Sequence, residues 1–188
     1  MQNISEKQNK MDFRKRPFII VDTETSGDDE LKHEILEIGL LVVSQKDWAV
    51  IDSGNWLIKP HHIENAIPAA LERNGYNEHD WRNAPELSDV MPIFSEKTKD
   101  GIFMAFNVSF DWAFIKNAFR ITNVPNLMDY HRLDVLTLAW ALGGDNLERL
   151  NLKAVAEFFG VPPEPDPHRA INGAETALEV LKKIKPSK

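Results

Sequence analysis

Two nearly continuous apolar runs constrain the fold of this chain more than any other feature. They are FIIV at residues 18–21 and ILEIGLLVV at residues 35–43. Both runs are rich in β-branched side chains, and polar residues bound them, which is typical of β-strands. A strand with one solvated face would alternate apolar and polar residues, so runs this continuous predict strands that are covered on both faces. Residues 48–58 predict a third strand after them.

After residue 60 the apolar residues recur mainly at helical spacing. A further apolar run at residues 102–106 predicts another strand. The last helix is expected to begin with Asp166 as its cap and Pro167 in its first turn. Strands followed by alternating strands and helices predict an α/β domain with a mixed central sheet flanked by helices. The other helices are predicted within residues 63–71, 87–94, 110–115, 133–142 and 152–159.

Length and composition favour one soluble domain. The chain has 188 residues and no cysteine, which excludes disulfides, thiolate metal sites and cysteine nucleophiles. The N-terminus lacks the apolar core of a signal peptide, and no apolar run approaches the ~20 residues that span a bilayer. We therefore expect a cytoplasmic protein without a membrane partner. We expect a flexible segment at residues 1–16, one domain at residues 17–184 and a tail at residues 185–188.

The charge of the chain is acidic and unevenly distributed. The formal net charge is -7, which by itself argues against a nucleic-acid partner. Residues 1–17 nevertheless hold five basic and two acidic residues, and residues 182–188 hold four basic residues and no acid. Both ends are interpreted as solvated termini that would add at most a weak attraction to a nucleic-acid strand.

The sequence VDTETSG at residues 21–27 places two carboxylates at the end of the first strand. Residues two apart on a strand point to the same face, so Asp22 and Glu24 stand side by side. Neighbouring carboxylates repel each other unless a cation lies between them, and oxygen ligands suit Mg²⁺ or Mn²⁺. The alternative is two polar residues at a strand exit with no ligand.

Two further segments accompany this motif, FNVSFDWAFI at residues 106–115 and HRAINGAETAL at residues 168–178. Together the three segments resemble the motifs of the DEDDh, or DnaQ-like, 3′–5′ exonucleases. That family includes the proofreading epsilon subunit of bacterial DNA polymerase III. The resemblance covers roughly residues 17–184 and implies a ribonuclease H-like fold.

The resemblance also implies a two-metal site for Mg²⁺ or Mn²⁺. It assigns Asp22, Glu24 and Asp111 as metal ligands, with Glu24 also counted among the catalytic residues. It assigns His168 as the general base, and an imidazole suits this role near neutral pH. Glu37 and Asp134 are expected to be structural. The residues that the resemblance implies for binding the terminal nucleotide are Thr23, Thr25 and Asn107.

The chain departs from the family pattern at two positions. Phe106 replaces the usual histidine of the second motif. Gly173 stands where the family has its fourth metal-binding aspartate, and glycine has no side chain to offer a metal. Its neighbours offer no convincing substitute, because on an ideal helix Glu175 lies about 200° round from position 173. The other two residues considered as substitutes are Asn172 and Asp166.

The resemblance implies a metal-dependent 3′–5′ exonuclease that hydrolyses DNA or RNA from the 3′ end to nucleoside 5′-monophosphates, with one ion weakened by Gly173. The alternative is a catalytically impaired relative that binds nucleic-acid ends or a protein partner. The expected partner is a single-stranded 3′ end. Association with a polymerase is also considered, although the C-terminal attachment segment of the epsilon subunit is expected to be absent.

Overall fold

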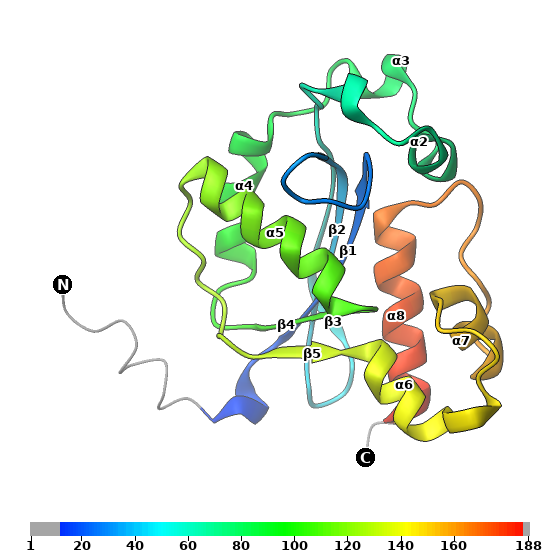
Figure 1. The fold of residues 1–188 in the computed structure, drawn as a ribbon. Helices are drawn as coiled ribbons and strands as arrows, with labels where there is room; N and C mark the ends of the chain where they lie inside the picture. The colour runs from blue at the N-terminus through cyan, green and yellow to red at the C-terminus, as the bar shows by residue number, and fades with distance from the viewer. Residues whose placement is uncertain (1–11, 186–188) are drawn as a thin grey trace.

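The computed structural model describes residues 12–185, and a five-stranded mixed sheet lies at its centre (Figure 1). The strand order is β3-β2-β1-β4-β5, which places β1 in the middle. β1 pairs antiparallel with β2 and parallel with β4. All residues of β2 are buried, and so are all of β1 except one, which confirms the prediction of strands covered on both faces. The strands are β1 (Phe18–Thr25), β2 (Ile35–Val43), β3 (Val50–Leu57), β4 (Ile102–Ala105) and β5 (Arg132–Asp134).

Helices cover both faces of this sheet, so the predicted α/β class is confirmed. Alternate residues of β1 supply the two cores: Phe18 and Ile20 pack with α6, α7 and α8, whereas Ile19 and Val21 pack with α4 and α5. The helices are α2 (Pro68–Asn74), α3 (Glu78–Trp81), α4 (Leu87–Lys97), α5 (Val108–Thr122), α6 (Val135–Gly143), α7 (Leu152–Phe158) and α8 (Ala170–Ile184). Three short 3₁₀ helices are η1 (Phe13–Lys15), η2 (Ile63–Asn65) and η3 (Gly144–Asn146).

The first turn of α8 lies unusually close to the sheet. A Cβ atom at Gly39 of β2 would lie 2.3 Å from the main-chain carbonyl carbon of Ala170. No side chain fits at that distance, so glycine is what allows the helix to begin there. Gly39 is paired with Asp22 of β1, and the beginning of α8 is therefore held beside that carboxylate.

The last helix begins at Ala170 rather than near Asp166, so the predicted start was wrong. Asp166 precedes a proline, and a following proline disfavours the helical conformation. The next residues are tied to other parts of the fold. The His168 N–H donates to the Arg73 carbonyl at 3.1 Å, and the Arg169 Nε lies 2.9 Å from the Glu37 carboxylate.

The helix predicted within residues 63–71 is divided into two. The 3₁₀ helix η2 ends at Asn65, and α2 begins at Pro68. A proline has no N–H to continue a helix, but it fits well at the first helical position. The division therefore places Pro68 where its missing N–H does no harm.

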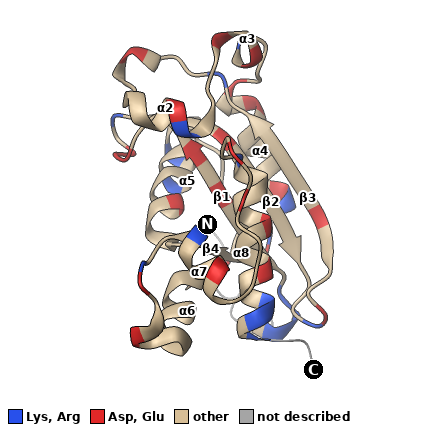
Figure 2. Cartoon of the chain, turned by 90° about the vertical axis from the view of Figure 1, so that its right-hand side faces the viewer, with Lys and Arg blue, Asp and Glu red and all other residues tan. Residues whose placement is uncertain are grey.

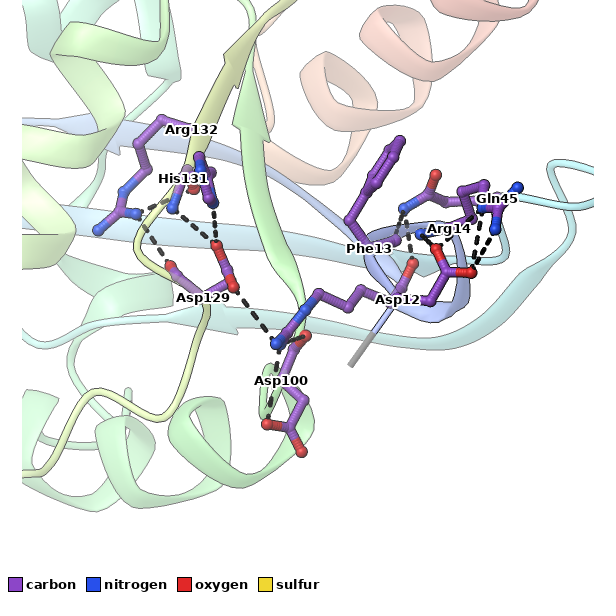
Figure 3. A network of polar contacts seen from close by, with 9 residues as sticks. Asp12, Phe13, Arg14, Gln45, Asp100, Asp129, His131 and Arg132 are labelled. Atoms are coloured by element: carbon purple, nitrogen blue, oxygen red, sulfur yellow. Dashed lines mark hydrogen bonds and ion pairs between the residues drawn. The ribbon is translucent and has the colours of Figure 1, made fainter. Parts of the chain in front are cut away.

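Part of the segment expected to be flexible, residues 1–16, is folded. Arg16 is 3% exposed, and its guanidinium lies 3.4 Å from Asp129 and donates at 2.8 Å to the Asp100 carbonyl. The Gln45 amide donates to the Phe13 carbonyl at 2.7 Å, which ties η1 to the loop after β2 (Figure 3). Residues 1–11 and 186–188, which hold most of the expected flexible segment and tail, lie outside the described residues.

Two further expectations concern membranes and charge. Within residues 12–185 the structure has no helix that combines the length and the apolar character needed to cross a membrane.

The basic residues Lys182 and Lys183 lie in the last turn of α8, at the end of the molecule away from α2 (Figure 2).

Candidate active site

The site begins where β1 extends beyond its parallel neighbour. β4 pairs with residues 18–20 of β1 only, so the main chain of residues 22–25 has no strand on that side. Asp22 and Glu24 point to the face covered by α8, and Thr23 points to the face covered by α5, as the alternation of a strand requires. The predicted side-by-side placement of Asp22 and Glu24 on one face follows from this geometry.

Asp111 reaches this strand end from the first turn of α5. Its Oδ1 atom accepts hydrogen bonds from the Thr23 N–H at 2.9 Å and from the Thr23 hydroxyl at 2.8 Å. The Asp111 carboxylate thus takes the place of a missing strand partner for Thr23. Asp111 is only 3% exposed, and these two bonds fix its position beside β1.

One hollow of about 330 Å³ brings the predicted site residues together. Asp22, Glu24, Asp111 and His168 line it, although up to 146 residues separate them in the sequence. Predicted metal ligands and a predicted base that converge on one concave surface are the arrangement expected of an active site. The other residues that line this hollow are Thr23, Arg73, Phe106, Asn107, Phe110, Leu150, Asn151, Leu152 and Glu164.

The carboxylates in this hollow disfavour one another's ionisation. Burial, followed by the charges of Asp111 and Glu24, raises the pKa of Asp22 well above its ordinary value. Burial and then the nearby Glu164 raise the pKa of Glu24 from 4.5 to about 8. Burial raises the pKa of Asp111 to about 7, although its bonds from Thr23 act in the opposite direction. Ionisation of all these carboxylates together is therefore unfavourable on its own, and a bound cation would relieve this cost.

Gly173 lies directly against Asp22. A Cβ atom at position 173 would be 2.6 Å from the Asp22 Cγ and from one carboxylate oxygen. The Asp22 carboxylate thus occupies the space that any side chain at position 173 would need. The departure from the family pattern at this position therefore coincides with a close contact between α8 and β1.

His168 lies in the extended segment before α8 and borders the hollow. Its side chain is 38% exposed, so it is open to solvent. The Nδ1 atom lies 3.8 Å from the Glu164 carboxylate, and the Nε2 atom lies 4.0 Å from that of Asp166. Both distances are too long for hydrogen bonds, so neither carboxylate holds the ring firmly.

The residues predicted to bind the terminal nucleotide differ in exposure and in whether their side chains already make hydrogen bonds. The Thr25 hydroxyl donates to the Gly27 carbonyl at 2.6 Å, and the Thr23 hydroxyl is bound to Asp111. Both threonines line a second hollow of about 180 Å³ next to the first. Asn107 is exposed at the beginning of α5 in a left-handed conformation, with φ at 62°. The nucleotide-binding roles of Thr23, Thr25 and Asn107 stay predictions.

Two carboxylates expected to be structural have structural contacts. Glu37 is fully buried and forms the ion pair with Arg169. Asp134 accepts from the Val108 N–H at 3.0 Å and from the Thr137 N–H at 3.1 Å, so it holds the beginnings of both α5 and α6. Phe106, in place of the family histidine, packs against the core beneath α6 and α8.

Sequence reasoning missed two charged residues at the site. Arg73, an exposed residue of α2, lines both hollows. Glu164 lines the larger one, and its side chain is 8% exposed. Neither residue belongs to a recognised motif, so no signal in the sequence pointed to them. Trp112, next to Asp111 in the sequence, packs between Phe103 and the guanidinium of Arg132, which lies 3.5 Å from the centroid of the indole.

The three carboxylates suit a hard divalent cation, although their side chains do not yet surround a single point. Asp22, Glu24 and Asp111 offer only oxygen atoms, the donors that Mg²⁺ and Mn²⁺ prefer. Glu24 is 9% exposed, and its carboxylate makes no hydrogen bond or ion pair with any residue in the described range 12–185. In the same range no three His, Cys, Asp or Glu side chains already surround one point, so binding an ion requires side chains to turn.

Comparison with known proteins identifies the family. Residues 19–181 match the family model RNase_T, described as Exonuclease. The chain belongs to this exonuclease family. The match includes all the site residues named above, so the exonuclease domain occupies nearly the whole described range. The resemblance to DnaQ-like exonucleases is thereby confirmed at the level of the family.

Relatives of this exonuclease domain are much longer proteins. The domain is 29% identical over 167 residues to "DNA polymerase III PolC-type" of Caldanaerobacter subterraneus, covering 89% of this chain and 11% of the relative. It is 32% identical over 169 residues to "3′-5′ exonuclease DinG" of Staphylococcus aureus, covering 87% of this chain and 18% of the relative. The chain thus spans less than a fifth of the length of these two relatives.

Solved structures confirm the fold. The exonuclease domain superposes with a TM-score of 0.73 on the zinc-bound form of Escherichia coli exonuclease I in complex with single-stranded DNA. The two chains are 18% identical, and the superposition covers 91% of this chain and 40% of the other. The likeness supports the predicted ribonuclease H-like architecture.

Proposed function

We propose that this exonuclease domain is a 3′–5′ exonuclease that depends on a divalent metal ion and releases nucleoside 5′-monophosphates. The observation that carries the proposal is the convergence of Asp22, Glu24, Asp111 and His168 on one hollow. The proposed direction of cleavage rests on the motif resemblance and on the DinG relative, which is named a 3′-5′ exonuclease. Single-stranded nucleic acid as the substrate is supported by the similarity to exonuclease I, which was solved in complex with single-stranded DNA.

In the proposed mechanism Asp22, Glu24 and Asp111 would hold Mg²⁺ or Mn²⁺. Bound there, such ions would neutralise the scissile phosphate and stabilise the attacking and leaving oxygens. The three carboxylates supply oxygen donors to this recess, and Asp111 and Glu24 are the more buried of the three.

His168 would act as the general base. Its exposed imidazole borders the hollow, where a water molecule can reach both the ring and the substrate. It would take the proton of the attacking water at Nε2, the nitrogen farther from Glu164. Such proton transfer contributes about 10²–10⁴-fold to a rate.

The remaining lining suits the end of a nucleic-acid strand. Arg73 offers a cation to a phosphate at the border between the two hollows. Phe110, which also lines both hollows, offers a half-buried aromatic ring to a base. Asn107 adds an exposed amide beside them.

Gly173 favours a second candidate function, that of an end-binding domain with impaired catalysis. The position lacks the carboxylate that the family pattern has there. A domain of this kind would bind a 3′ end tightly and cleave it slowly or not at all. The same hollow would serve both functions, so an assay must measure binding and cleavage together.

The test is a time course on single-stranded DNA and RNA labelled at the 5′ end, with Mg²⁺, Mn²⁺ or EDTA. The wild type is compared with Asp22→Asn, which keeps the shape of the side chain. We expect a ladder of products shortened from the 3′ end, which is abolished by EDTA and by the substitution. Cleavage that survives Asp22→Asn would contradict the assigned site. Tight binding by fluorescence anisotropy with no metal-dependent cleavage would favour the end-binding domain.

A further inference from the structure

We infer that Glu164 supplies the fourth carboxylate of the metal site, in place of the side chain that Gly173 lacks. The inference rests on the proposed function, because it concerns a ligand of the same metal-binding hollow. It assigns a divalent-cation ligand to a loop residue that belongs to none of the recognised motifs.

The position of Glu164 is the first argument. The residue lies in the loop between α7 and α8, four positions before His168, and it lines the same hollow as Asp22, Glu24 and Asp111. Its charge acts on both strand carboxylates, because it contributes to the raised pKa of Asp22 and of Glu24. The Glu164 carboxylate thus belongs to the same acidic hollow as these two carboxylates.

The absence of a partner is the second argument. The Glu164 side chain is 92% buried, and it makes no hydrogen bond with any residue from 12 to 185. Among the described residues, the charged neighbour in ion-pair range is the His168 ring at 3.8 Å, which is charged only when it is protonated. Glu24, which lines the same hollow, is 9% exposed and also makes no hydrogen bond or ion pair within the described part of the chain. The oxygens of both carboxylates are open to the hollow, so a cation bound there can act as the partner that they lack.

The contact at Gly173 is the third argument. A side chain at position 173 would overlap the Asp22 carboxylate, because its Cβ would lie 2.6 Å from the Asp22 Cγ. Unless Asp22 shifts, a fourth ligand must therefore approach from elsewhere. Among the residues considered from the sequence, Asp166 has a side chain that is 96% exposed, and Glu175 is exposed on α8. Asn172 and Glu175 do not line the hollow, whereas Glu164 does.

The experiment measures Mn²⁺ binding to the full chain, stripped of metal, by electron paramagnetic resonance of free Mn²⁺. The variants are Glu164→Gln, the matched loop control Asp166→Asn, and Asp22→Asn. Thermal unfolding in EDTA shows whether each variant is folded. A second variant, Glu164→Ala, provides the same test if Glu164→Gln fails to fold.

We expect Glu164→Gln to weaken Mn²⁺ binding at least about tenfold, or to remove one of two bound ions. Asp166→Asn should stay within about twofold of the wild type. If Glu164→Gln binds Mn²⁺ as the wild type does while Asp22→Asn does not, Glu164 is not a ligand. The inference about Glu164 then fails, while the proposed metal-dependent function stands. If neither the wild type nor any variant binds Mn²⁺, the proposed metal-dependent function fails as well.

Discussion

The two sides of the hollow are built in different ways. One side, which we call the strand side, consists of Asp22, Glu24 and Asp111 at the end of β1 and the beginning of α5. The other, the loop side, consists of residues 159–173 before and within the first turn of α8. Hydrogen bonds from Thr23 hold Asp111 on the strand side, and strand pairing holds β1. On the loop side His168 and Glu164 have no side-chain hydrogen bonds among the residues described.

This difference shows which part of such a site tolerates change. A carboxylate on a central, buried strand has its direction set by the sheet, so the strand side cannot move without disturbing the core. A loop can bring a carboxylate from a different position in the sequence. The departure at Gly173 lies on the loop side, and Glu164, the residue that we infer replaces it, also lies there.

The largest expected effect comes from breaking the strand side. Asp22→Asn should lower the cleavage rate by about 10³-fold or more, because stabilisation of the phosphate by metal ions supplies several kcal/mol. Raising the Mn²⁺ concentration should not restore the rate. Initial rates on a labelled oligonucleotide measure this, with the exposed acid Glu175→Gln as the control. A variant that keeps a tenth of the wild-type rate would contradict the assignment.

The next effect concerns the base on the loop side. His168→Gln should lower the turnover rate by about 10²–10³-fold, because proton transfer from water is lost. The affinity for a DNA 3′ end should change little. Single-turnover kinetics and fluorescence anisotropy separate the two quantities. A variant with weaker binding and an unchanged turnover rate would assign His168 to substrate binding instead.

A third effect is the pH dependence of stability on the strand side. The pKa of Glu24 is raised from 4.5 to about 8 in the folded protein. The folded state therefore binds this proton more tightly than the unfolded state, and its stabilising effect is complete below pH 4.5. That effect is lost as the pH rises towards 8, so the free energy of unfolding in EDTA should fall over this range.

Glu24→Gln removes this titration and should raise the free energy of unfolding at pH 8 by about 2–4 kcal/mol. Urea denaturation in EDTA at pH 5, 6.5 and 8 measures the difference, with Glu175→Gln as the matched exposed control. Added Mg²⁺ should stabilise the wild type more than the variant. If the variant follows the wild-type pH dependence, Glu24 does not titrate with the raised pKa described.

The smallest effect concerns the contact between the two sides. Gly173→Ala adds one methyl group where the Asp22 carboxylate now lies. Overpacking costs about 1–3 kcal/mol, and the better helix propensity of alanine returns up to about 1 kcal/mol. We expect a net loss of about 1 kcal/mol and a rate about tenfold lower. Asn172→Ala, in the same turn of α8, is the control, and equal behaviour of the two variants would show that the contact is unimportant.

The strand side was predictable from the sequence, because short-range rules determine it. An apolar strand followed by Asp-x-Glu places Asp22 and Glu24 on one face, and Asp111 follows as part of a motif. The loop side was only partly predictable. His168 belongs to a motif, but no periodicity relates Glu164 to Asp22, 142 positions earlier. The close approach of Gly173 to Asp22 depends on how α8 packs on the sheet, which the sequence does not show.

The start of α8 illustrates the same limit. Asp166 and Pro167 have the composition of a helix start, yet the helix begins at Ala170. Long-range contacts decide the outcome: Arg169 pairs with Glu37 of β2, and the His168 N–H binds the Arg73 carbonyl of α2. These contacts keep the segment extended and place His168 at the hollow instead of within the helix.

The most direct test of the central claim is the identity of the first product. A single-stranded oligonucleotide that carries a label on the base of its 3′-terminal nucleotide is mixed with excess enzyme and Mg²⁺. The labelled products are then separated by chromatography. The account predicts that the first labelled product is the nucleoside 5′-monophosphate, because water attacks the phosphorus of the last phosphodiester and the 3′ oxygen leaves. A labelled nucleoside without phosphate, or an internal fragment as the first product, would contradict it.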